Sequence, residues 1–216
     1  MKKGIIFDLD GTMWDSSKEV AEAYDLALQK AGIPLRVTTA DVRAVMGKTM
    51  VEIAHIYFDE IDPARAVDIM TACIDEENEY LRTHSGKVYG GLEAALSALS
   101  RKGYFLACVS NCQSGYIEAF YESTGLGKYF SDKECWGGTG LPKSGNIKLV
   151  VERNNLDDAV YVGDTMGDFN SSAEAGVKFI HAAYGYGDAP EGTPKISSPA
   201  ELFDAVEKVF GENIKP

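Results

Sequence analysis

The 216-residue sequence has no apolar run approaching the ~20 residues needed to span a bilayer. It carries 21 basic against 33 acidic residues, for a formal charge of -12, and no basic cluster stands out. Such a field repels nucleic acid and anionic lipid headgroups, so we expect neither as a partner. An anionic substrate would need local cations that outweigh the global charge.

Cysteine and histidine are scarce, and neither has the spacing of a metal site. The four cysteines form no Cys-x-x-Cys pair, and the three histidines form no ligand pair or triad. The apolar residues between Lys3 and Asp8 are too few for the core of a signal peptide. We therefore expect free thiols in a cytoplasmic protein.

Short apolar runs alternate with helical patterns along much of the chain. This alternation predicts an α/β fold with a doubly wound, mostly parallel sheet. Proline in the first turn supports a closing helix over residues 199–210. The predicted strands cover residues 4–7, 104–109, 159–162 and 177–182, with a weaker one at 134–137.

Residues 16–85 show helical periodicity and no convincing strand. Val20, Tyr24 and Leu28 repeat at helical spacing, and Gly32 then Pro34 end that helix. A crossover between parallel strands needs only about a dozen residues, so this stretch is too long for a simple connection. We predict a small helical domain at 16–85, inserted into an α/β core formed by residues 1–15 and 86–216.

Two pairs of aspartates follow predicted strands. Asp8 and Asp10 come after the first strand, and Asp164 and Asp168 follow the strand at 159–162. The carboxyl ends of parallel strands form the ligand crevice of such sheets, so we expect these groups to converge. Like charges ~4 Å apart repel by roughly 4 kcal/mol at an effective dielectric of 20, and oxygen-only ligands favour Mg²⁺.

Polar donors are expected beside these carboxylates. Ser110 and Asn111 follow the strand at 104–109 and offer a hydroxyl and an amide. Lys143 lies in a predicted loop at 138–144, ahead of a helix starting near Gly145, and can supply the local cation that a phosphoryl group requires.

These residues, in this order, resemble the motifs of the haloacid dehalogenase superfamily, specifically its phosphatase branch with a helical cap inserted after the first motif. The resemblance covers nearly the whole chain and implies a Rossmann-like core. Around Gly185-Tyr186-Gly187 it extends to phosphoglycolate-phosphatase-like members. The motifs are Asp8-Leu9-Asp10-Gly11-Thr12, Ser110, Lys143 and Gly163-Asp164 to Asp168.

The resemblance implies a role for each motif residue. Asp8 would attack phosphorus to form an aspartyl phosphate, and Asp10 would protonate the leaving group and then activate water. Mg²⁺ would be bound by Asp8, the backbone carbonyl of Asp10, and Asp164, with Asp168 a direct or water-mediated ligand. Ser110 and Lys143 would hold the phosphoryl oxygens. Thr12 and Asn111 are further candidates for substrate binding.

Lys48 is a candidate specificity residue. Gly47-Lys48-Thr49 is similar to the end of a phosphate-binding P-loop, but Val42 stands where that motif needs its first glycine. In capped members of the superfamily a loop of this kind reaches over the active site, so Lys48 would contact the leaving group.

The expected function is Mg²⁺-dependent hydrolysis of a small phosphomonoester, such as phosphoglycolate or a sugar phosphate. The second aspartate, Asp10, favours phosphoryl transfer over halide displacement. A phosphosugar mutase similar to β-phosphoglucomutase stays open, as does a phosphonate hydrolase that uses Lys48 as a Schiff base. A receiver-like regulatory domain is a further alternative, although its chain order and length differ. The expected partner is a small phosphorylated metabolite; the oligomeric state stays open.

Overall fold

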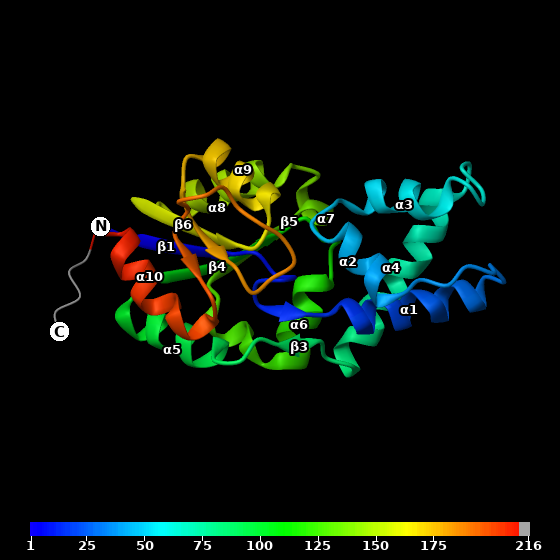
Figure 1. Ribbon diagram of the computed structural model, residues 1–216, viewed down its shortest axis with the longest axis horizontal. Helices are drawn as coiled ribbons and strands as arrows, with labels where there is room; N and C mark the ends of the chain where they lie inside the picture. The colour runs from blue at the N-terminus through cyan, green and yellow to red at the C-terminus, as the bar shows by residue number, and fades with distance from the viewer. Residues whose placement is uncertain (212–216) are drawn as a thin grey trace.

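A parallel sheet forms the centre of the larger lobe in the computed structural model, which describes residues 1–211 (Figure 1). Its strand order is β5-β4-β1-β6-β7-β8, and β1 pairs in parallel with both β4 and β6. The central strands are apolar and buried, as parallel strands covered on both faces must be. The strands are β1 Lys3–Phe7, β4 Phe105–Ser110, β5 Asp132–Cys135, β6 Asp158–Gly163, β7 Lys178–Ala182 and β8 Lys195–Ile196.

Helices cover both faces of the sheet. Alternate residues of β1 point to opposite faces, so Ile5 and Phe7 join one apolar cluster and Ile6 joins the other. The first cluster includes residues of α5, α6 and α10, and the second includes residues of α8 and α9. The doubly wound α/β fold expected from the sequence is confirmed. These helices are α5 Leu92–Lys102, α6 Tyr116–Thr124, α7 Trp136–Thr139, α8 Lys143–Arg153, α9 Met166–Ala175 and α10 Leu202–Val209, with short 3-10 turns at Leu126–Tyr129 and Pro199–Glu201.

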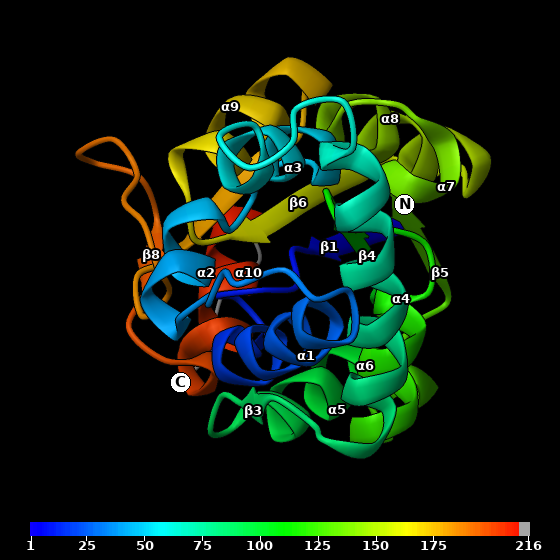
Figure 2. The same ribbon diagram turned by 90° about the vertical axis from the view of Figure 1, so that its right-hand side faces the viewer.

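Residues 16–85, here called the cap segment, hold four helices in the structure described. A short antiparallel pair, β2 Trp14–Asp15 with β3 Lys87–Val88, flanks them. Figure 2 looks from the side of the cap segment and shows its helices in front of the strands of the sheet. The helices are α1 Ser17–Lys30, α2 Thr39–Val45, α3 Met50–Phe58 and α4 Ala66–Thr83.

Two predicted boundaries were wrong. The strand expected at 134–137 ends at Cys135, and α7 begins at Trp136. Residue 137 has to be glycine in this turn, because a Cβ there would lie 2.3 Å from the Ser114 nitrogen. Lys143 does not lie in a loop before a helix starting near Gly145. It is the first residue of α8, after Pro142 as N-cap.

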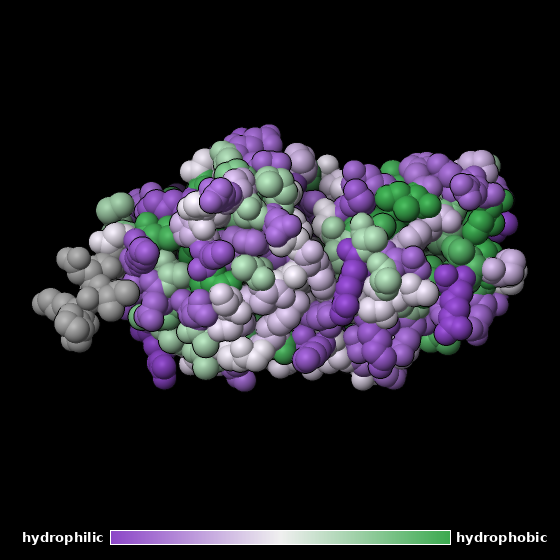
Figure 3. Space-filling model, in the orientation of Figure 1, coloured by the Kyte–Doolittle hydropathy of each residue, from purple (hydrophilic) through white to green (hydrophobic). Residues whose placement is uncertain are grey.

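Exposed apolar side chains gather on α3, the turn after it and the start of α4. Val51, Ile56, Ile61 and Val67 are each between 39% and 53% exposed. Figure 3 shows apolar surface at this end of the molecule. None of the four lines the pocket described below. Among residues 1–211, no helix is both long enough and apolar enough to traverse a bilayer.

Candidate active site

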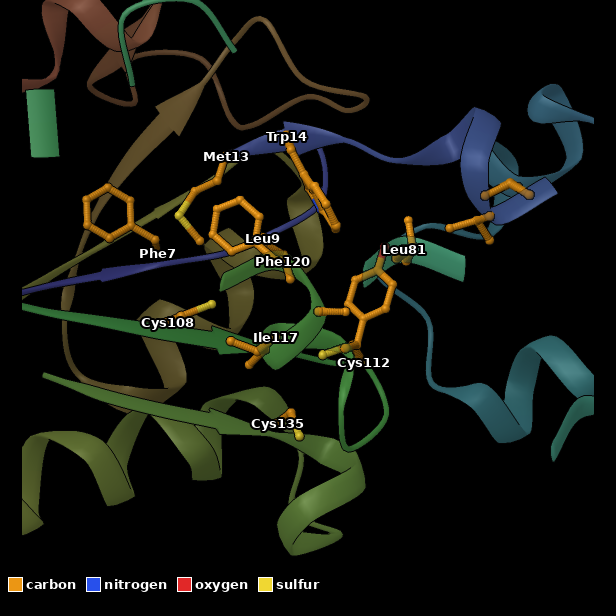
Figure 4. Close-up of a cluster of buried hydrophobic side chains, with 14 of the residues drawn as sticks. Phe7, Leu9, Met13, Trp14, Leu81, Cys108, Cys112, Ile117, Phe120 and Cys135 are labelled. Carbon is orange, nitrogen blue, oxygen red and sulfur yellow. The ribbon is translucent and has the colours of Figure 1, made fainter. Parts of the chain in front are cut away.

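The loop after β1 carries Asp8 and Asp10 on a buried apolar base. Leu9, Met13 and Trp14 are fully buried, and Trp14 packs edge-on against Phe120 of α6 with ring centroids 4.9 Å apart (Figure 4). The amide of Asp8 donates to the Val162 carbonyl at 2.8 Å, so the loop continues the pairing of β1 with β6. This anchoring places the two carboxylates at the carboxyl ends of the central strands.

Gly11 has to be glycine in this loop. Its φ is +78°, a left-handed conformation, and a Cβ there would lie 2.2 Å from Asp164 Oδ2. The close approach lets the first loop and the loop after β6 meet at one place.

Asp8, Asp164 and Asp168 form a buried cluster whose candidate ligand oxygens all lie within 4.8 Å of one another. Burial raises the pKa of Asp8 well above its usual value, and the charge of Asp168 raises it further. Burial, then Asp168, raises the pKa of Asp164 to about 7. Keeping these buried carboxylates ionised therefore costs free energy, and a bound cation would reduce that cost.

Lys143 supplies one cation to this cluster. Its Nζ donates to Asp8 Oδ1 at 3.0 Å and to Asp168 Oδ1 at 2.6 Å, and the side chain is 4% exposed. Burial lowers the pKa of Lys143, but the carboxylates of Asp168 and Asp8 raise it by more, so the net direction is upward. The amine is thus held in its charged form at the position from which it could reach a phosphoryl group.

Asp168 already uses both of its oxygens. Oδ2 accepts from the Thr165 amide, from the Thr165 hydroxyl and from the Asp164 amide in the capping box of α9. With Oδ1 on Lys143, the carboxylate orients the lysine and fixes the start of α9. The sequence analysis predicted a direct or water-mediated metal ligand at this position.

Two further groups orient Asp164. Thr12 donates to its Oδ1 at 3.2 Å, and the Tyr186 amide donates to its Oδ2 at 2.7 Å. Thr12, expected to bind substrate, is only 1% exposed and contacts this carboxylate instead. The Tyr186 hydroxyl donates to Asp15, which pairs with Arg43 of α2 at 2.6 Å. A chain of contacts therefore links Asp164 to the cap segment.

The carboxyl group of Asp10 is held by three donors that sequence reasoning missed. Trp14 Nε1, the Ser16 hydroxyl and the Tyr116 hydroxyl lie 2.9, 2.7 and 2.8 Å from its Oδ1. Burial raises the pKa of Asp10, although the hydrogen bonds from Ser16, Tyr116 and Trp14 each oppose that shift. A carboxyl with a raised pKa and a fixed orientation suits proton transfer.

A pocket of about 40 Å³ lies between these core residues and the cap segment. Asp10, Ser110 and Asn111 line its core side, and Lys48, exposed on the loop before α3, lines its cap side. Asn111 Nδ2 donates to the Gly47 carbonyl at 2.8 Å, which ties the cap loop to the end of β4. The structure thus brings Lys48, Ser110 and Asn111 together beside Asp10.

The family model of haloacid dehalogenase-like hydrolases matches residues 5–182, a span that contains every candidate site residue. The chain belongs to this family. It is therefore an enzyme of the hydrolase class that its motifs indicated, and the resemblance read from the sequence is confirmed.

Curated relatives of this hydrolase match it over nearly its whole length. A plasmid-encoded phosphoglycolate phosphatase of Cupriavidus necator is 29% identical, with 94% of this chain and 89% of that protein covered. Phosphoglycolate phosphatase of Escherichia coli K12 is 28% identical, with 96% and 91% covered. A crystal structure of a predicted phosphatase from Clostridium acetobutylicum superposes with a TM-score of 0.76 at 24% identity, covering 96% of this chain and 99% of that one, which shows the shared fold.

Glu77 is a further pocket residue that the sequence analysis did not single out. It lies on α4 at 3% exposure and lines the pocket that contains Asp10. A signal for it exists in the sequence. Met70, Cys73 and Leu81 mark the buried face of α4, and Glu77 falls on that face, where an acid is unusual.

Proposed function

We propose that the protein is a Mg²⁺-dependent phosphatase that hydrolyses a small phosphomonoester through an aspartyl phosphate on Asp8. The observation that carries this proposal is the buried cluster of Asp8, Asp164 and Asp168 with Lys143 between two of its members. The names of the relatives support it, because phosphoglycolate is a phosphomonoester of this size class.

The residues present fit a divalent cation. Three carboxylates face one ammonium group, and their donor atoms are all oxygen. Burial, then mutual repulsion, raises the pKa of both Asp8 and Asp164. Asp8, Asp164 and the backbone carbonyl of Asp10 would hold Mg²⁺, and Asp168 would contribute through water because both of its oxygens have partners. When bound, Mg²⁺ would supply positive charge that offsets the negative charge of the carboxylates and of the phosphoryl group.

The proposed reaction has two steps, and Asp10 takes part in both. In the first, a carboxylate oxygen of Asp8 bonds to phosphorus, the ester bond breaks, and Asp10 gives its proton to the leaving alkoxide. In the second, Asp10 takes a proton from water, whose oxygen bonds to phosphorus and releases Asp8 and inorganic phosphate. Ser110 and Lys143 hold the phosphoryl oxygens throughout.

The cap segment encloses the reacting groups. The hydrogen bond from Asn111 to Gly47 and the ion pair of Arg43 with Asp15 hold it against the strand ends. We propose that this closure excludes bulk water during the first step.

Phosphate release from a panel of small phosphomonoesters tests the proposal. We expect turnover with Mg²⁺, none with chelator, and none in Asp8→Asn, whose amide cannot act as the nucleophile. Asp59→Asn, which changes a half-exposed acid of the cap segment, is the matched control and should keep full activity. Isomer formation without phosphate release would favour a mutase instead.

A further inference from the structure

The pocket beside Asp10 is walled in part by apolar side chains of the cap segment. Val42, Val45, Met46 and Ile53 form much of the wall. A water molecule needs roughly 10–15 Å³ of such space, so about 40 Å³ admits only a few non-hydrogen atoms. A substrate whose phosphate lies at Asp8 would place its leaving group here, because Asp10, two residues further along the same loop, lines the pocket.

Glu77 provides an acidic group on the cap side of this pocket. Gln113 Nε2 donates to its Oε2 at 2.9 Å, and the Tyr24 hydroxyl is also hydrogen-bonded to it. Both partners line the pocket and are buried, which fixes the position of the carboxyl group. A carboxyl group buried this far from water is unfavourable unless its surroundings provide partners.

Asn111 provides an acceptor without a partner. The Gly47 carbonyl can only accept a hydrogen bond, so the amide nitrogen of Asn111 must face it, and this sets the orientation of the amide. Oδ1 is then left buried, and among the side chains of residues 1–211 it is one of the few buried polar atoms with no hydrogen-bond partner. An unmet buried acceptor costs about 1–3 kcal/mol, which a donor on the ligand would recover.

The acidic and basic side chains that line the pocket differ in their exposure to solvent. Asp10 and Glu77 are acids within the pocket, whereas Lys48, the lining residue with a positive charge, is exposed at its edge. A leaving group with a carboxylate or a second phosphate would bring only acceptors, so it would offer no donor to Asn111 Oδ1. A hydroxyl group or an ammonium group would offer one.

We propose that Glu77 is a specificity residue that, with Asn111, selects small leaving groups bearing a hydroxyl or ammonium donor over leaving groups bearing a second anion. This inference rests on the proposed function, because it assumes that the pocket holds the leaving group of a phosphomonoester. It sharpens the substrate class to phosphate esters of short diols or amino alcohols.

Three esters of matched size and different charge test it. They are 2-phosphoglycolate with a carboxylate, 2-hydroxyethyl phosphate with a hydroxyl, and O-phosphoethanolamine with an ammonium. With Mg²⁺ and wild-type enzyme, kcat/KM for the hydroxyl and ammonium esters should exceed that for 2-phosphoglycolate by about tenfold or more. At pH 9, above the pKa of about 8 of Glu77, the ratio of O-phosphoethanolamine to 2-phosphoglycolate should fall by about tenfold in Glu77→Gln, because an amide offers no charge to an ammonium group.

The neighbouring acid gives the control. Glu76→Gln makes the same chemical change one residue away, outside this pocket, and should leave the ratios unmoved. If Glu77→Gln does not fold, Tyr24→Phe, which removes one hydrogen bond to Glu77, should move the ratio in the same direction by less.

The outcomes separate the inference from the function it rests on. A wild-type preference for 2-phosphoglycolate, a ratio that neither variant moves, or activity confined to larger esters would overturn the inference and leave the phosphatase standing. No phosphate release from any ester in the wider panel would overturn the proposed function itself.

Discussion

Lys143 Nζ lies 3.0 Å from Asp8 Oδ1 although the two residues are 135 positions apart in the chain. Both are almost fully buried, at side-chain exposures of 4% and 6%. The helix α8 begins at Lys143, so the start of one helix presents its first side chain to the end of β1. The charge of this lysine is what lets three carboxylates share a buried space.

Removing that charge should destabilise the fold. In Lys143→Met, Asp8 and Asp168 lose their buried partner, and breaking such a pair costs about 3 kcal/mol or more. Urea unfolding at neutral pH in the presence of chelator measures it. Adding Asp168→Asn to this variant should recover part of the loss, since one unpaired carboxylate is removed. A single variant as stable as wild type would contradict the electrostatic account of the cluster.

Binding of Mg²⁺ should strengthen as pH rises. Burial and Asp168 raise the pKa of Asp164 to about 7, so below that pH a proton competes for the same oxygens. From one pH unit below that pKa to one pH unit above it, the ionised fraction of Asp164 rises by about tenfold. Calorimetric titration should show the affinity for Mg²⁺ rising by at least the same factor. Equal affinity on the two sides of pH 7 would show that Asp164 is not a ligand.

Tyr116→Phe should move the pH profile. The Tyr116 hydroxyl stabilises the charged form of Asp10, so its loss raises the pKa of Asp10 further. Asp10 must be protonated to assist the leaving group, so the alkaline limb of kcat/KM should shift to higher pH. Tyr121→Phe is the control, because its buried hydroxyl on the same helix has no hydrogen-bond partner in residues 1–211. An alkaline limb that stays in place in Tyr116→Phe would exclude Asp10 as the acid.

Glu77→Gln should gain stability relative to wild type as pH rises. Burial, then the charge of Asp10, raises the pKa of Glu77 from 4.5 to about 8, so the folded state favours its protonated form. Wild type therefore keeps its full stability below pH 4.5 and loses some of it as pH rises through 8, whereas glutamine loses none. The difference should reach about 5 kcal/mol in urea unfolding between acidic and alkaline pH, and Glu76→Gln should show none. Parallel pH dependence of wild type and Glu77→Gln would contradict a buried, protonatable Glu77.

The sequence could predict the sheet and the acids at its edge because these are local patterns. The apolar run before Asp8 and the one before Asp164 are short, buried and followed by helical periodicity, so both strands were found. The start of α8 was predicted too late because lysine is an unusual first residue for a helix. The burial of Lys143 between two carboxylates depends on long-range contacts that no local sequence pattern shows.

The partners of Asp10 and the role of Glu77 could not be predicted in the same way. Tyr116 reaches Asp10 only because α6 packs against Trp14. The two segments lie about a hundred residues apart in the chain. Glu77 could have been predicted, because the sequence shows an acidic residue on the apolar face of a helix, where acids are rare. Its pocket, however, forms only where α4 meets the loop after β4.

The central claim is that Asp8 carries the phosphoryl group, and trapping that group tests it most directly. Enzyme quenched in acid during turnover and treated with borohydride should contain homoserine at position 8, because reduction of an aspartyl phosphate leaves an alcohol. Mass spectrometry of the peptide spanning residues 4–18 would distinguish Asp8 from Asp10 and Asp15. We predict homoserine at position 8 that depends on substrate and is absent from Asp8→Asn. Turnover without any reduced residue at position 8, or with the reduced residue at another aspartate, would contradict the account.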